Sequence, residues 1–168
     1  MEFCFEKATG SDIPGIMHVM ESAAASLEKD DWYITDDESF IRRIVEAQGF
    51  VAVAKDGDRI AGFLTIYCPG CSEDNLGRDL GFSDEMLMQA VHFDSAAVLP
   101  EYRGNGLQKK LIRYAMEMLR GTEYRYYFAT VHPDNAASYK SLTSCGFEPR
   151  KTVLKYGSNL RCIVYREK

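Results

Sequence analysis

The sequence lacks any run of about 20 apolar residues, the length that a membrane-spanning helix needs. Its N-terminal stretch has no basic start followed by an apolar segment, so it predicts no export signal. Internal repeats, low-complexity tracts and linkers rich in Ser, Gly or Pro are missing as well. We therefore expect one domain over residues 1–168, located in the cytoplasm and not bound to a membrane.

The composition gives little support to a metal site or to nucleic-acid binding. An odd number of cysteines favours reduced thiols over a disulfide framework. Cys68 and Cys71 have the spacing of a zinc half-site or redox pair, but no second pair completes a tetrahedral site, so two thiols in a Pro-Gly turn are preferred. A net charge of −5 without a concentrated basic face disfavours nucleic acid and is compatible with amine-bearing substrates.

Hydrophobic periodicity predicts the order β-α-α-β-β-β-α-β-α-β-β. A strand at 89–98, a helix at 104–120 and a strand at 124–131 should form one parallel, right-handed βαβ unit. The remaining strands should be antiparallel. The predicted class is α+β, a mixed and mostly antiparallel sheet of about seven strands with a central parallel unit and about four helices. The other strands are expected at 2–8, 49–55, 59–67, 148–156 and 160–166, and the other helices at 11–25, 37–46 and 135–145.

The most informative segment is the junction between the strand at 89–98 and the helix after it, where residues 103–108 are RGNGLQ. The first N–H groups of a helix have no partner inside the helix, and they attract anions. Gly104 and Gly106 remove the Cβ atoms that would keep phosphates away from this backbone, and Arg103 adds positive charge. A diphosphate is the ligand that this arrangement suits best, although the spacing alone also fits a plain strand-to-helix turn.

This junction resembles the signature of the GNAT superfamily of N-acetyltransferases, which is Gln/Arg-x-x-Gly-x-Gly/Ala. Arg103 takes the first position and Gly106 the fourth, whereas Gln108 occupies the sixth, where the family usually has Gly or Ala. A second segment, residues 132–138 (HPDNAAS) followed by Cys-Gly-Phe at 145–147, is similar to the family's Asn-helix-Gly-Phe region. The order of elements fits over nearly the whole chain. The resemblance implies a GNAT-like fold.

The resemblance also implies where acetyl-CoA binds as co-substrate, without a metal. The strands that end at Val98 and Val131 would splay apart, with the pantetheine arm between them. That arm would bond to the backbone of Ala96, Ala97 and Val98, and Asn135 would lie beside it. The pyrophosphate would meet the backbone amides of Arg103, Gly104, Asn105, Gly106, Leu107 and Gln108.

Two side chains on the strand at 89–98 are candidates for the chemistry. An amine must lose a proton before it attacks a thioester, so the reaction needs a base. His92 and Asp94 should face the same side as Ala96 unless a bulge intervenes. We expect His92 to act as base, with His132 as another candidate, and Asp94 to hydrogen-bond or orient the substrate. A surface or structural histidine is the alternative at both histidine positions.

The acid that protonates the departing thiolate is harder to assign. In the family a Tyr often stands seven residues after the Asn, but here that position is Leu142. Tyr139, one helical turn earlier, is the candidate acid, and a plain packing role is its alternative. The missing Tyr leaves two functions open. One is transfer of an acetyl group to a primary amine of a small molecule or peptide, and the other is a catalytically weak acyl-CoA-binding sensor or interaction module.

Two acidic segments bear on the expected partners, which are coenzyme A and an amine-bearing acceptor. Residues 28–38 combine acidic and aromatic side chains that would hold an ammonium group, unless they form a solvated loop with Trp32 in the core. Residues 73–86 would either cover the acceptor side or form a subunit contact in a homodimer.

Overall fold

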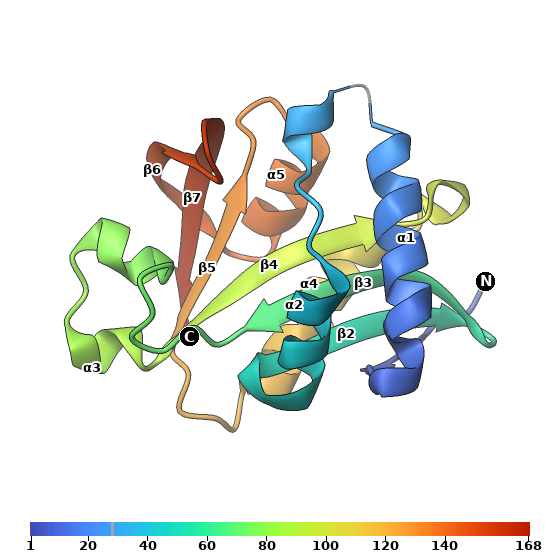
Figure 1. Cartoon of the computed structure of the whole chain (residues 1–168), viewed down its shortest axis with the longest axis horizontal. Helices are drawn as coiled ribbons and strands as arrows, with labels where there is room; N and C mark the ends of the chain where they lie inside the picture. Colours follow the sequence, from blue (N-terminus) through green and yellow to red (C-terminus); the bar gives the residue numbers. More distant parts are fainter. Residues whose placement is uncertain (28) are drawn as a thin grey trace.

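A computed structural model of the protein describes residues 1–27 and 29–168. A seven-stranded sheet in the order β1-β2-β3-β4-β5-β7-β6 forms its centre (Figure 1). The strands are β1 (Cys4–Lys7), β2 (Gly49–Asp56), β3 (Arg59–Tyr67), β4 (Ala90–Val98), β5 (Tyr126–Val131), β6 (Glu148–Lys155) and β7 (Asn159–Glu167). The α-helices are α1 (Ile13–Ala25), α2 (Glu38–Arg43), α3 (Asp84–Leu87), α4 (Leu107–Leu119) and α5 (Ala136–Ser144).

The strand pairing confirms the predicted α+β class. Strands β4 and β5 pair in parallel and are joined by α4, whereas the other paired strands are antiparallel. One detail differs from the prediction, because the helix expected at 37–46 is divided into α2 and a π-helical turn at Ile44–Gln48. The polar segment after β3 contains the one-turn helix α3.

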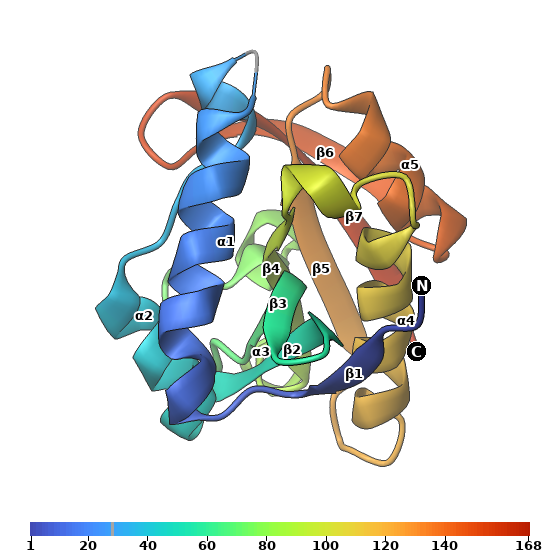
Figure 2. The same cartoon turned by 90° about the vertical axis from the view of Figure 1, so that its right-hand side faces the viewer.

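The helices lie on both faces of the sheet. In Figure 2, α1 lies on one side of the strands and α4 on the other. Apolar side chains at helical spacing bury one stripe of α4, because they recur every three to four residues. Met118 of the same helix is 37% exposed. The buried residues of α4 are Leu107, Leu111, Ile112, Ala115 and Leu119.

The pairing of β4 with β5 ends early, and this creates the space for a site. Backbone pairs join residues 90–92 to residues 126–128, and the two strands continue to Val98 and Val131 without further pairs between them. The predicted splay of these strands is therefore present. On its other edge β4 pairs with β3 and contains a bulge, because Asp94 and Ser95 together stand opposite Thr65.

Within the described part of the chain, no helix is both long enough and apolar enough to cross a membrane.

Candidate active site

The loop before α4 has the backbone that an anion site requires. Gly104 and Gly106 adopt positive φ values of 84° and 67°, which side chains with a Cβ rarely adopt. A Cβ built on either glycine would meet no heavy atom within 4 Å, so the space beside this backbone is open. Gly106 is the N-cap of α4 and provides no side-chain cap. No hydrogen bond from the N–H groups of residues 104–108 is present among the described residues, which leaves these donors for a ligand.

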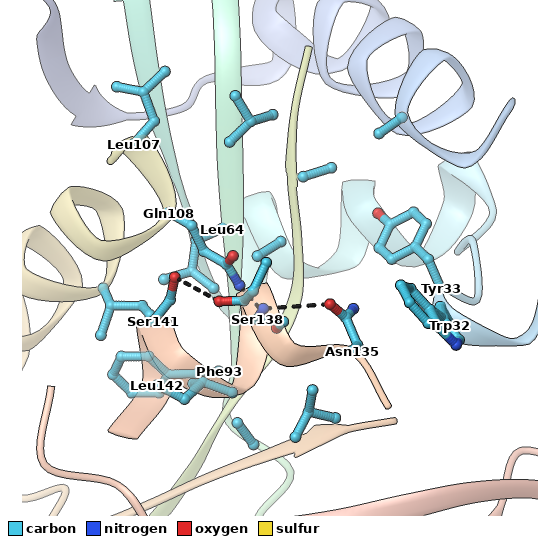
Figure 3. A pocket seen from close by; sticks show the side chains of 18 of the residues that line it. Trp32, Tyr33, Leu64, Phe93, Leu107, Gln108, Asn135, Ser138, Ser141 and Leu142 are labelled. Atoms are coloured by element: carbon cyan, nitrogen blue, oxygen red, sulfur yellow. Dashed lines mark hydrogen bonds between the residues drawn. The ribbon is translucent and has the colours of Figure 1, made fainter. Parts of the chain in front are cut away.

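A cavity of about 460 Å³ runs from this loop into the gap between β4 and β5 (Figure 3). Asn105 does not line it, because its side-chain amide donates to the carbonyl of Tyr102 at 2.9 Å and holds the loop from within. The other residues predicted to bind the cofactor do line the cavity: Ala96, Ala97, Val98, Arg103, Gly104, Gly106, Leu107, Gln108 and Asn135.

Asn135 points its side chain toward the cavity from the start of α5. Its Oδ1 accepts the backbone N–H of Ser138 at 3.3 Å and caps the helix. The Nδ2 group makes no hydrogen bond within residues 1–27 and 29–168, so it can donate to a ligand. Gln108 reaches the same region from α4 (Figure 3).

A second, smaller cavity of about 100 Å³ adjoins the first. Within the acidic and aromatic segment expected to hold an ammonium group, residue 28 lies outside the described residues, and residues between 32 and 36 supply part of the wall. The β6–β7 hairpin supplies Tyr156 and Arg161. Tyr156 has a left-handed backbone, with φ at 52°, and its hydroxyl lies 3.1 Å from that of Thr130. The lining consists of Trp32, Tyr33, Ile34, Asp36, Asp94, Ser95, Thr130, Tyr156 and Arg161. Four of these residues also line the larger cavity: Trp32, Tyr33, Asp94 and Thr130.

Asp94 therefore lies where the two cavities meet. Its carboxylate has neither an ion pair nor a hydrogen bond to any described residue. Burial raises the pKa of Asp94 to about 7, and the negative charges of Asp36 and Asp74 act in the same direction. Asp36 is held nearby, because Ser95 donates its hydroxyl to that carboxylate at 2.5 Å. A carboxyl group that titrates near neutrality suits a general base.

His92 lies outside both cavities. It occupies the last position at which β4 still pairs with β5, before the strands splay. The side chain is buried, and its Nε2 accepts the backbone N–H of Leu76 at 3.0 Å. Burial lowers the pKa of His92 to about 4, so the ring stays neutral at pH 7 and serves as a structural acceptor.

Neither His132 nor Tyr139 lines either cavity. His132 accepts the backbone N–H of Asp134 through Nδ1, and its Nε2 lies 3.3 Å from the Asp31 carboxylate. Tyr139 is half-buried against the core. Leu142 contributes to the larger cavity instead, so α5 presents an aliphatic group where the family often has a phenol.

Tyr33 places a phenol where the two cavities meet, and sequence reasoning had noted only its segment. Its hydroxyl is buried and has no hydrogen-bond partner among the described residues. Burial raises the pKa of this phenol above its ordinary value, so it keeps its proton. Sequence reasoning also missed Tyr156 and Arg161, since no motif links the last hairpin to a site formed by β4 and β5.

The segment at 73–86 lies elsewhere. Its Leu76 packs with Ala90, Phe128 and Ile163, so the segment covers the paired end of β4 and β5 and contributes no lining residue to either cavity. Among residues 1–27 and 29–168, no group of three or more His, Cys, Asp or Glu side chains could hold a metal ion.

Comparisons with known proteins agree with this geometry. A family model described as "Acetyltransferase (GNAT) family" matches residues 16–147. L-2,4-diaminobutyric acid acetyltransferase from Shouchella clausii is 35% identical over 86 residues, which is 51% of this chain but only 40% of that protein.

Two solved structures share the fold at low sequence identity. The ribosomal-protein-S18-alanine N-acetyltransferase from Escherichia coli superimposes with a TM-score of 0.73 at 15% identity, over 99% of this chain and 94% of that one. The protein yncA from Salmonella typhimurium, solved with its cofactor acetyl-CoA, gives a TM-score of 0.68 at 19% identity, over 98% and 93% of the two chains.

Proposed function

Because the chain belongs to the GNAT acetyltransferase family, we propose that it transfers the acetyl group of acetyl-CoA to a primary amine of a small molecule or peptide. The observation that carries this proposal is the meeting of two cavities at Asp94. The larger one suits the acyl donor and the smaller one suits the acceptor amine. A carboxylate at their junction is placed to take the proton that the amine must lose.

The larger cavity has the features that coenzyme A requires. Free N–H groups and two glycines at the start of α4 suit the pyrophosphate. The unpaired inner edges of β4 and β5 leave backbone groups that the amides of pantetheine can satisfy. The Nδ2 group of Asn135 is available as a further donor. These features support binding of the thioester end near Asp94.

In the proposed reaction Asp94 removes a proton from the acceptor ammonium, and the neutral amine then attacks the thioester carbonyl. Free N–H groups on the splayed part of β4 can stabilise the oxyanion that forms. The tetrahedral intermediate collapses when the C–S bond breaks, and coenzyme A leaves as a thiolate. The Tyr33 hydroxyl, still protonated, is the proposed donor to that thiolate, and the resulting phenolate takes back the excess proton of the attacking nitrogen, which leaves a neutral amide.

The amine acceptor is best sought with a panel. Acetyl-CoA and candidate amines are incubated with the protein, and release of free thiol is followed. L-2,4-diaminobutyric acid belongs in the panel because it is the substrate in the name of the partly matching relative. Lysine side chains and peptide N-termini represent the larger acceptors. Asp94→Asn serves as control, and we expect it to lose the amine-dependent thiol release.

The alternative is a module that binds acyl-CoA without turnover, which Leu142 in place of a tyrosine favours. The same assay separates the two. Thiol release that no amine raises above background hydrolysis, together with tight coenzyme A binding in calorimetry, would support the module. Amine-dependent release that vanishes in Asp94→Asn would support the enzyme.

A further inference from the structure

Arg161 is a buried cation in the wall of the smaller cavity. Only 3% of its surface is exposed. Its guanidinium donates to two backbone carbonyls, that of Leu160 at 2.8 Å and that of Asp31 at 2.6 Å. It makes no ion pair with a described carboxylate, and burial lowers its pKa although the charge of Asp31 acts in the opposite direction. The Tyr156 ring centroid lies 5.9 Å from the guanidinium. A buried cation that no carboxylate contacts is costly, so this arrangement suits an anion from outside the chain.

The lining of the smaller cavity carries charges of both signs. Asp94 and Asp36 supply negative charge, whereas Arg161 supplies the positive charge among its described lining residues. Two of the lining residues carry further buried donors, the Tyr33 hydroxyl and the Trp32 indole N–H, which have no partner within the described part of the chain. A ligand that satisfies all of these groups must carry both a cation and an anion.

We infer that the acceptor is a small amino acid, whose carboxylate pairs with Arg161 while its amine lies at Asp94. This inference rests on the proposed function, because it assigns the acceptor of the same site. Arg161 suits a carboxylate because its planar guanidinium can donate two parallel hydrogen bonds. The volume of about 100 Å³ fits a molecule of amino-acid size.

The same arrangement disfavours other amines. A diamine without a carboxylate would place its second ammonium group near the Arg161 cation, where like charges repel. The N-terminal residue of a peptide has an amide in place of its carboxylate, so it would leave the cation unpaired. The inference therefore narrows the proposed acceptors from amines in general to amines that carry a free carboxylate.

The first test compares acids with matched amides. Glycine, β-alanine and 4-aminobutyrate separate the amine from the carboxylate by successive methylene groups, and each has a primary amide of nearly the same size. We expect at least one acid to exceed its amide in kcat/KM by tenfold or more, mainly through a lower KM. Equal kcat/KM for acid and amide at every chain length would overturn the inference.

The second test changes Arg161. Arg161→Met removes the charge and retains much of the length, and Arg161→Lys retains the charge. The readout is the ratio of kcat/KM for the preferred acid to that for its amide. We expect Arg161→Met to lower this ratio at least tenfold and Arg161→Lys to lower it less. If both substrates lose activity equally in Arg161→Met, so that the ratio is unchanged, Arg161 has a structural role and the inference fails. Circular dichroism and coenzyme A binding verify that the variants fold.

A third measurement separates this inference from the proposed function, because it needs no turnover. Trp32 is the single tryptophan of the chain and lines both cavities, so its fluorescence should report acceptor binding without acetyl-CoA. Binding of 4-aminobutyrate or a shorter acid in preference to its amide, without any acetyl transfer, would support the inference and contradict the enzyme. Acetyl transfer to amines regardless of a carboxylate would support the enzyme and overturn the inference.

Discussion

Gln108 on the first turn of α4 donates a hydrogen bond from Nε2 to the hydroxyl of Ser138 on the first turn of α5, at 3.0 Å. The bond joins the two helices at the wall of the larger cavity. It also gives a role to the residue that departs from the family signature, since a Gly or Ala at position 108 could not make this contact.

Replacing Gln108 with Ala tests that role. We expect the free energy of unfolding to fall by about 0.5–1.5 kcal/mol, the usual contribution of one hydrogen bond. Coenzyme A affinity should change by less than about threefold, because the backbone N–H at position 108 remains. Ser138→Ala is the matched control, and the double variant should be no less stable than the worse single one. A tenfold loss of affinity in Gln108→Ala alone would show instead that the side chain binds coenzyme A.

The anion site before α4 can be tested with two substitutions of nearly equal size. Asn and Asp both tolerate the left-handed backbone of Gly106, but only Asp brings a negative charge, which favours a helix N-terminus in the absence of ligand. We therefore expect Gly106→Asp to be at least as stable as Gly106→Asn and to bind coenzyme A about tenfold or more weakly in calorimetry. Equal affinities of the two variants would contradict a pyrophosphate at this turn. Gly106→Glu, which adds bulk as well as charge, should abolish binding with the fold intact.

The pH dependence of catalysis should report Asp94. As base, the carboxylate must be deprotonated, so kcat/KM should rise with pH through an apparent pKa of about 7. Asp94→Asn should lower kcat by roughly 10²–10⁴-fold and remove this titration, with little change in the KM for acetyl-CoA. A variant that keeps both its rate and its pH profile would exclude Asp94 as the base.

The stability of the protein should show the opposite pH dependence, because protonation of Asp94 favours the folded state. The pKa of Asp94 is raised from 3.8 in the unfolded chain to about 7 in the folded protein. Its favourable contribution is thus complete below about pH 4 and is lost as pH rises through 7. The Asp94→Asn variant should not lose stability in this way, because its amide side chain does not titrate. Denaturant unfolding should show the variant gaining about 1–3 kcal/mol over the parent between pH 5 and pH 8, and a difference independent of pH would contradict the raised pKa.

His92 offers a prediction about structure in place of catalysis. Leu cannot accept the N–H of Leu76, so His92→Leu should cost about 1–3 kcal/mol of stability for the unpaired buried donor. Gln retains an acceptor oxygen and should cost less. Both variants should keep the pH profile of kcat/KM with its apparent pKa near 7. Loss of that titration in His92→Gln would return the role of base to the histidine.

The sequence indicated many of the residues that line the larger cavity, because this part of the site depends on backbone. Gly104 and Gly106 stood out from glycine spacing at a helix start, which is a local feature, and Asn135 came from the family resemblance; all three line the larger cavity. The βαβ unit followed from the same local periodicity. Asn105 is the exception, since its polar side chain serves the loop itself.

The smaller cavity, which is the proposed acceptor side, could be predicted only in part from the sequence. The segment with Trp32 and Tyr33 was expected to hold an amine, but the rest of the cavity depends on contacts between distant segments. Arg161 donates to the backbone of Asp31, 130 residues earlier, and Tyr156 of the β6–β7 turn contacts Thr130 of β5. The alternation of side chains along a strand places His92 and Asp94 on the same face, so it could not show which of the two reaches the cavities. That difference arises because β4 loses its partner strand between the two residues.

The bulge in β4 limits the kinds of mutation that this strand can tolerate during evolution. Asp94 and Ser95 together occupy the place opposite Thr65, so deletion of either residue would let the strand resume regular pairing. The residues that follow would keep their partners on β3, but a single residue would have to replace both the Asp94 carboxylate at the cavities and the Ser95 hydroxyl that donates to Asp36. A substitution changes one of these two side chains at a time, whereas a one-codon deletion disturbs the positions of both. We expect insertion and deletion scanning to find β4 far less permissive than substitution scanning does.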